Sequence, residues 1–114
     1  MNERMKRMSG HTEQILQQFK ECIPLLDVLT DENRQAIIML LAQNKSGLHV
    51  NAIASHIDLS RPAVSHHLKV LKQSGFITSE KKGVENYYVL TVRQPLERLK
   101  TLIAAVEAQC DGSR

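Results

Sequence analysis

The sequence predicts a mostly α-helical domain that carries one small β-hairpin. Hydrophobic residues make up 42% of the 114 residues, whereas aromatic residues make up only 4% and tryptophan is missing. A core of aliphatic side chains with so few rings is typical of packed helices rather than of a β-sandwich. Apolar residues recur every three or four positions along most of the chain, and they alternate in steps of two only after Gly75. At this length we expect a single domain.

The first part of the chain has the apolar spacing of two amphipathic helices. Residues 1–11 are polar and are expected to form a flexible tail, which leaves a domain over 12–110. The first apolar stripe steps by four, three and four residues through Ile15, Phe19, Cys22 and Leu26. We expect Pro24 to bend or restart this helix. Thr30 or Asp31 offers an N-cap for a second helix, which ends at 44–47.

The central segment has the pattern of a helix, a tight turn and a second helix over about 51–74. Residues 48–50 are expected to form a short edge strand, after which Asn51 can cap the first of these helices. Residues 58–60 are expected to form the turn. Ser60 caps the second helix, Pro62 lies in its first turn and Gly75 follows its end, as helix termini prefer.

The last part of the chain predicts a β-hairpin over about 76–90 and a final helix over about 95–110. The β-prone segments 76–79 and 87–90 are separated by a charged stretch that contains Gly83. Pro95 opens the final helix, whose apolar stripe runs through Leu96, Leu99, Ile103, Val106 and Cys110. Two helices joined by a tight turn and followed by a hairpin predict a winged helix-turn-helix.

The basic residues are concentrated on the segments that such a fold presents to nucleic acid. The whole chain has a formal net charge of +3, but residues 60–83 hold five basic and one acidic side chain, which gives +4 there and −1 elsewhere. This clustering favours double-stranded DNA as the partner. The alternative is a winged helix that binds another protein and has no role on DNA, although a protein-binding face is more often apolar.

The helix that follows Ser60 is predicted to have one apolar face and one basic, hydroxylic face. Projection at about 100° per residue places Val64, Leu68 and Leu71 on the apolar face. His67 borders that face and is expected to be packed and hydrogen-bonded. The polar face carries Arg61, Ser65, His66, Lys69 and Lys72. Of these, the guanidinium of the arginine can bond guanine O6 and N7 together, whereas the lysines are expected to contact phosphates.

Residues 25–90 closely resemble the small bacterial ArsR-type (ArsR/SmtB) repressors. The resemblance rests on LDVLTDENRQAIIMLL and on IASHIDLSRPAVSHHLKVLKQSGFITSEKKGVENYYVL, and its most specific part is the block 59–75. It implies a dimeric winged helix that represses transcription by binding an imperfect palindrome, and that leaves DNA when a signal arrives. Glutamine is frequent in the family where Arg61 stands. The expected DNA-binding set, with two lysines of the wing, is Ser60, Arg61, Ser65, His66, Lys69, Lys72, Lys81 and Lys82.

The resemblance also implies that the first and last helices form a homodimer interface. The three-four stripe of the final helix agrees with this, because little chain is left to cover it. The alternative is that the stripe packs only within its own subunit. The expected interface residues are Ile15, Phe19, Cys22, Leu96, Leu99, Ile103, Val106 and Cys110.

We expect no metal site and no cofactor. Where metal-sensing relatives place a Cys-x-Cys pair, this chain has His49 and Asn51, and no histidine follows His67 to build the family's second site. Cys22 and Cys110 are expected to be small buried hydrophobes. The alternative is a thiol switch, in which these two cysteines bridge in response to an oxidant.

An enzymatic function and a membrane location are both disfavoured. The chain contains no recognisable set of nucleophile, base and orienting acid, and no glycine-rich phosphate loop. No apolar run approaches the roughly 20 residues of a membrane span, and the first residues lack the apolar stretch of a secretory signal. We therefore expect a cytoplasmic protein that is not an enzyme.

Overall fold

The computed structural model describes residues 10–111 of the chain. Of the expected tail over 1–11, residues 1–9 lie outside this range, whereas Gly10 and His11 already belong to the first helix. The expectation that the tail extends to residue 11 was therefore wrong for Gly10 and His11, which are helical. Glu13 lies in the first turn, where a carboxylate interacts favourably with the unpaired N–H groups of the helix start.

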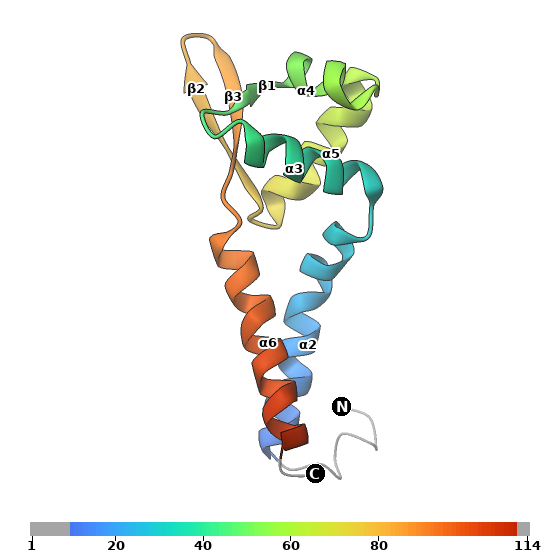
Figure 1. Ribbon diagram of the computed structural model, residues 1–114, viewed down its shortest axis with the longest axis vertical. Coiled ribbons are helices and arrows are strands. Elements are labelled where there is room, and N and C mark those ends of the chain that lie inside the picture. Colours follow the sequence, from blue (N-terminus) through green and yellow to red (C-terminus); the bar gives the residue numbers. More distant parts are fainter. Residues whose placement is uncertain (1–9, 112–114) are drawn as a thin grey trace.

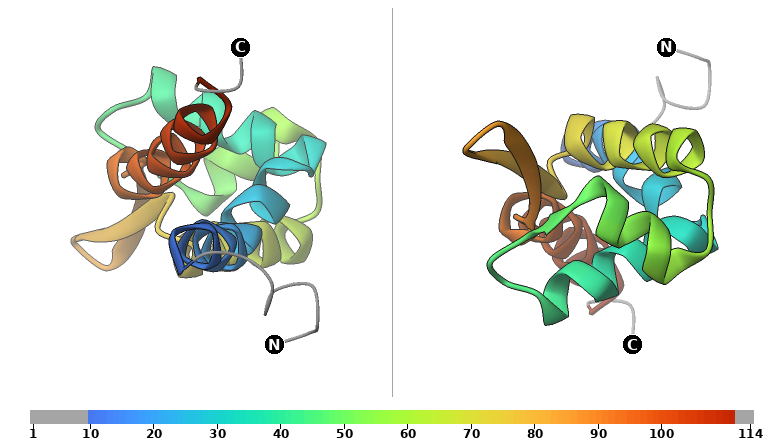
Figure 2. Two further views of the ribbon diagram at one scale, coloured as in Figure 1. Left: turned by 90° about the horizontal axis from the view of Figure 1, so that it is seen from below. Right: turned by 90° about the horizontal axis from the view of Figure 1, so that it is seen from above.

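Two long antiparallel helices form a stem beneath the rest of the molecule (Figure 1). They are α2, Gly10–Leu29, and α6, Arg93–Asp111. The molecule measures 54 × 25 × 24 Å, so the stem makes it about twice as long as it is wide. Seen from below, α2 in blue and α6 in red lie next to each other under the other helices (Figure 2). The lower part of the stem therefore extends away from the other helices and strands, and its sides form a surface of their own.

Both stem helices differ in detail from the sequence prediction. Of the predicted bend or restart at Pro24, the restart is excluded, because α2 continues through the proline as one helix. Proline removes one backbone hydrogen bond, but buried side chains on both sides, Cys22 and Leu25, hold the helix against its neighbours. The helix α6 begins at Arg93 rather than at Pro95. The proline lies in its first turn, where its missing N–H has no partner to lose.

Three shorter helices lie above the stem: α3, Glu32–Gln43, α4, Val50–Ile57, and α5, Arg61–Gln73. Ser60 caps α5, as predicted, with its Oγ accepting a bond from the N–H of Ala63 at 3.3 Å. The cap of α4 is not Asn51 but His49, whose Nδ1 accepts from the N–H of Asn51 at 3.2 Å. Since the helix starts one residue before Asn51, that asparagine lies inside its first turn.

The strands form a three-stranded antiparallel sheet in the order β1-β3-β2. They are β1, Leu48–His49, β2, Ile77–Lys82, and β3, Glu85–Leu90. The two residues of β1 pair with Tyr88 and Tyr87, so the predicted edge strand joins the hairpin on its β3 side. The strand is shorter than the predicted 48–50, because Val50 begins α4. We call the β2–β3 hairpin the wing. It extends beyond the helices when seen from above, as the orange and tan ribbon (Figure 2).

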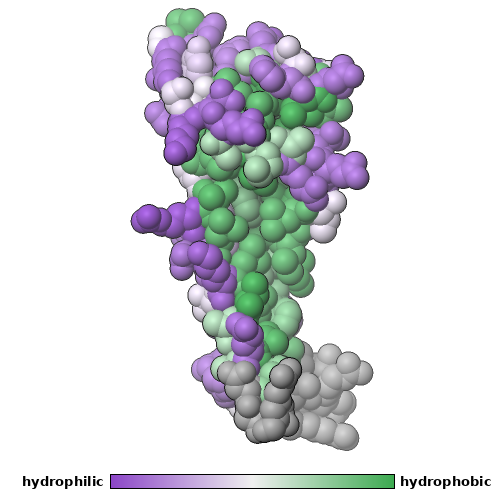
Figure 3. All heavy atoms as spheres, in the orientation of Figure 1, coloured by the Kyte–Doolittle hydropathy of each residue, from purple (hydrophilic) through white to green (hydrophobic). Residues whose placement is uncertain are grey.

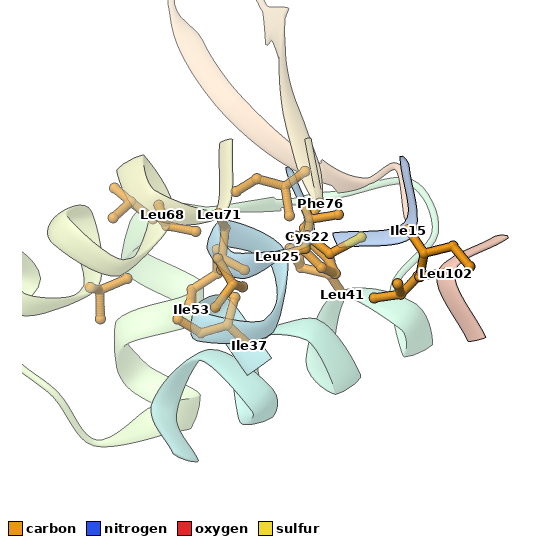
Figure 4. Packing of buried hydrophobic residues seen from close by; sticks show 14 residues of the cluster. Ile15, Cys22, Leu25, Ile37, Leu41, Ile53, Leu68, Leu71, Phe76 and Leu102 are labelled. Atoms are coloured by element: carbon orange, nitrogen blue, oxygen red, sulfur yellow. The ribbon is translucent and has the colours of Figure 1, made fainter. Parts of the chain in front are cut away.

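The core lies where α2, α3, α4 and α5 converge under the base of the wing (Figure 4). Its most deeply buried side chains are aliphatic, apart from Phe76 at the start of the wing. They are Val28, Ile37, Leu41, Ile53, Val64, Leu68 and Leu71. Ile15 and Leu102 continue the buried cluster into the stem. The predicted apolar face of α5 is thus confirmed, and it fixes which side of that helix remains exposed.

The cap of α3 gives a prediction for acid stability. Hydrogen bonds from the N–H groups of Arg34 and Asn33, at 3.1 and 2.8 Å, hold the pKa of the Asp31 carboxyl below its ordinary value of 3.8. A lowered pKa in the folded state means that the carboxylate stabilises the fold above the ordinary pKa. This stabilising contribution disappears as the pH falls through the lowered pKa of the folded state.

We expect Asp31→Ala to lower the free energy of unfolding by about 1 kcal/mol at neutral pH. Asp31→Asn keeps the cap, because an amide oxygen accepts equally well, but it removes the charge that titrates. Urea unfolding at neutral pH and below about pH 4 measures both effects. An equal acid-induced loss of stability in the wild type and in Asp31→Asn would contradict the assignment.

Candidate nucleic-acid interface

The helix α5 presents a polar face to solvent. Its buried residues Val64, Leu68 and Leu71 are at most 2% exposed and face the core. The side chains predicted for the opposite face are all exposed, namely Arg61, Ser65, His66, Lys69 and Lys72. An exposed polar helix that follows a tight turn is the recognition element of a helix-turn-helix.

The residues of the turn before α5 suit the backbone conformations and the helix cap that the turn requires. Asp58 ends α4 in the left-handed conformation, at φ 59°, which aspartate tolerates better than most residues. Ser60 has an extended backbone, and its carbonyl accepts from the N–H of Val64 at 3.0 Å. Arg61 therefore occupies the first position of α5, at the end from which such helices touch base edges.

A groove of about 300 Å³ lies between the start of α5 and the wing. Arg61 and Ser65 line it from α5, and residues of the wing line it from the other side. The wing residues are Val84, Glu85, Asn86 and Tyr88, none of which was predicted from the sequence. These four residues come to lie opposite the helix only because β3 pairs with β1 and β2. From the sequence, their position after Gly83 indicates only that they lie at or near the tip of the hairpin.

The basic side chains fall into two groups. Arg61, Lys69 and Lys81 have no hydrogen-bond or ion-pair partner among residues 10–111. Lys72 instead donates from Nζ to Ser79 Oγ at 2.9 Å. Lys82 donates from Nζ to the carbonyl of Ser46 at 2.8 Å. The first group is available to a ligand, whereas the second is occupied within the protein.

The adjacent histidines of α5 lie on different sides, as the projection predicts. His66 is exposed and His67 is half-buried, with their ring centroids 6.0 Å apart. The predicted hydrogen bond of His67 was wrong, because its buried Nδ1 has no partner within the described part of the chain. No group of three or more potential metal ligands occurs among these residues either.

The stem carries an exposed apolar face, which Figure 3 shows as green spheres running down its length. We call it the apolar stem face, and its residues are Phe19, Ile23, Leu26, Leu96 and Ile103. They are between 37% and 58% exposed, which is high for large aliphatic and aromatic side chains. None of the helices in the described range is long and apolar enough to cross a membrane.

The predicted interface set does not lie on one surface. Ile15 and Cys22 are buried inside the subunit, at 7% and 3% exposure, and Leu99 and Val106 are half-buried against the core. Phe19, Leu96, Ile103 and Cys110 are exposed. The apolar spacing predicts one face for the stripe of α2, but α6 of the same subunit covers half of that stripe. Ile23, which is not in the predicted interface set, is exposed at 58%.

The two cysteines lie at different levels of the stem. The Sγ of Cys22 is 3.7 Å from the carbonyl oxygen of Arg98, to which it donates. Cys110 is exposed. It lies twelve residues after Arg98 in α6, which corresponds to about 18 Å of helix. The expectation that both are buried was therefore wrong for Cys110, and bridging within one subunit would require α6 to move.

Similar proteins of known sequence or structure include bacterial transcriptional regulators. A profile described as "Bacterial regulatory protein, arsR family" matches residues 31–79. The transcriptional repressor SdpR of Bacillus subtilis is 40% identical over 63 residues, which cover 54% of this chain and 67% of SdpR. A solved structure of a possible transcriptional regulator for arsenical resistance is 34% identical, with a TM-score of 0.60 over 71% of this chain and 81% of that one.

A homodimeric winged helix-turn-helix DNA-binding domain from Mycobacterium bovis is also similar, with a TM-score of 0.60 and 25% identity. The match covers 90% of this chain and 89% of that domain, so it includes the stem. The relatives found are transcriptional regulators and not enzymes, in agreement with the sequence prediction. The chain therefore belongs to the ArsR family of bacterial regulatory proteins and is a winged helix-turn-helix transcriptional regulator.

Proposed function

We propose that this regulator is a homodimeric repressor that binds an imperfect palindromic operator through α5 and its wing. The observation that carries the proposal is the groove between them. Arg61 lines it, and three basic side chains around α5 and the wing have no partner within residues 10–111. A cationic side chain that the protein leaves unpaired at a recognition helix is suited to phosphates and guanine edges.

The residues of this surface are expected to make different kinds of contact with DNA. Arg61, Ser65 and His66, in the first half of α5, are placed to meet base edges in the major groove. Lys69 and Lys81 are expected to contact phosphates. Ser60 contributes chiefly as the cap of α5, and Lys72 and Lys82 already have protein partners. This division assigns sequence discrimination to α5 and most of the salt dependence to two lysines.

The proposed dimer forms through the apolar stem face. Five large apolar side chains are exposed there on adjacent helices, and burying them against a second copy removes them from water. The related Mycobacterium bovis domain is homodimeric and aligns along the stem. With one α5 in each half-site, the half-site centres should lie about 34–36 Å apart, one turn of DNA.

We propose that the regulator works without the metal sites of its metal-sensing relatives. His49 stands where a thiolate would be needed, and its Nδ1 is engaged in capping α4. Soft metals prefer sulfur ligands, and the imidazole of His49 and the amide of Asn51 provide none. Operator binding is therefore expected to be the same with added Zn²⁺ and with a chelator.

Selection of bound sequences from random DNA tests the proposal, followed by titration of the selected duplex at increasing salt. We expect an inverted repeat to be enriched. We also expect log K to fall with log salt with a slope of about −3.6 or steeper, because two lysines in each of two subunits each contribute about 0.9. Weak, salt-independent binding without an enriched sequence would instead favour a protein-interaction module.

A further inference from the structure

The wing carries two adjacent lysines that lie on opposite faces of the sheet. Lys81 pairs with Asn86 and Lys82 pairs with Glu85, and neighbouring residues of a strand point to opposite sides. Ser79 and Tyr88 share the face of Lys81. Ser79 contacts Lys72 of α5, and Tyr88 packs against the core, so this face is turned toward α5. Lys82 therefore lies on the side of the wing that is turned away from the recognition helix.

The ammonium group of Lys82 is held by two groups of the protein. Its Nζ donates to the carbonyl oxygen of Ser46 at 2.8 Å and lies 4.8 Å from the centre of the Tyr87 ring. Ser46 belongs to the turn between α3 and β1, and Tyr87 belongs to β3. The lysine, which belongs to β2, thus crosses β3 and joins the outer strand of the wing to the body of the protein.

The contacts continue from Tyr87 to the helix-turn-helix. Tyr87 pairs with His49 of β1, and the two rings are in edge contact with centroids 6.2 Å apart. His49 caps α4 by accepting from the N–H of Asn51. A continuous series of contacts therefore leads from the tip of the wing to the start of α4.

The wing needs such an anchor because its sheet is narrow. β1 pairs with β3 only at Tyr87 and Tyr88, so the hairpin beyond these residues is a two-stranded ribbon. A ribbon of two strands is marginally stable in water by itself. A hydrogen bond and a cation–π contact made by one side chain near its tip restrict how far it can swing.

We infer that Lys82 is a positioning residue, which sets the angle of the wing against DNA by binding Ser46 and Tyr87 rather than a phosphate. The inference rests on the proposed operator binding. Removing this side chain lets the wing of the free protein adopt other angles, so holding the wing in place when Lys81 meets its phosphate costs binding free energy. The number of phosphate contacts in the bound state stays the same.

The test compares Lys82→Ala with its neighbour Lys81→Ala in the full-length protein, using fluorescence anisotropy on the selected operator duplex at several salt concentrations. For Lys82→Ala we expect affinity to fall about threefold to tenfold with an unchanged salt slope. For Lys81→Ala we expect the slope to become shallower by about 1.8, since each of two subunits loses one contact. A shallower slope for Lys82→Ala, or an unchanged affinity, would overturn the inference.

Two further variants separate positioning from loss of folding. Lys82→Arg keeps a donor and a cation over the ring, so it should retain more affinity than Lys82→Ala. Tyr87→Leu should lower affinity similarly, and the double variant with Lys82→Ala should lose less than the sum of the two. Additive losses would argue against a shared contact. Absence of salt-dependent DNA binding by the wild type would contradict the proposed function. The positioning role of Lys82 is contradicted instead when the wild type binds but the variants do not differ in the way described.

Discussion

Replacing Arg61 by alanine is expected to weaken operator binding by about 1–3 kcal/mol, or about 5-fold to 150-fold. Arg61 is the first residue of α5, is exposed, lines the groove toward the wing, and has no partner in the range 10–111. A guanidinium in that place can bond both acceptors of a guanine edge, and alanine leaves them unpaired in the groove. The loss should therefore depend on sequence.

Binding of Arg61→Ala to the operator and to a random duplex of equal length, at one salt concentration, measures this dependence. We expect a large loss on the operator, a small loss on random DNA, and relaxed preference at one base pair of each half-site. Lys69→Ala is the matched control on the same helix, since a phosphate contact is lost on both duplexes alike. Equal losses of Arg61→Ala on the two duplexes would assign the arginine to the DNA backbone.

If the proposed dimer forms through the apolar stem face, replacing Ile23 by aspartate is expected to convert it into folded monomers. The side chain is 58% exposed on the apolar stem face, so the monomer accepts a carboxylate there. At an apolar dimer interface the same carboxylate would lose its water without gaining a partner. Monomers bind half-sites independently, so operator affinity should fall about 100-fold or more through loss of the linked second contact.

Sedimentation and circular dichroism of Ile23→Asp test this expectation, together with operator binding. Gln17→Asp is the control, because Gln17 is an exposed polar position on another side of α2. It should leave the dimer and the operator affinity as in the wild type. A dimeric Ile23→Asp protein would show that the subunits meet elsewhere.

Much of the recognition helix could be predicted from the sequence because its signals are local. The N-cap of Ser60, the proline after it and the spacing of Val64, Leu68 and Leu71 depend only on neighbours along one helix. The separation of His66 from His67 follows from the same 100° step. Of the two caps predicted for α3, Thr30 and Asp31, the structure uses Asp31, since aspartate before a first helical turn is a strong local preference.

The stem was less predictable because an amphipathic stripe does not say which partner covers it. Ile15 and Phe19 are equally apolar and four residues apart, yet one is buried by α6 and the other faces solvent. The sequence could not divide the stripe between an inner and an outer face. Likewise, nothing near Pro24 in the sequence indicates that packing on both sides holds α2 together.

The sequence by itself determined the order of the elements, the faces of α5 and the basic character of α5 and the wing. These depend on propensities, caps and periods that act within a few residues. The tertiary structure alone decided which cations remain available. Lys81 and Lys82 are identical neighbours, but the pleat of β2 places them on opposite faces of the strand. Lys82 contacts Tyr87 and Ser46, and Ser46 lies 36 residues before it in the chain. Contacts between distant segments depend on how strands pair and turns close, which no local pattern of residues specifies.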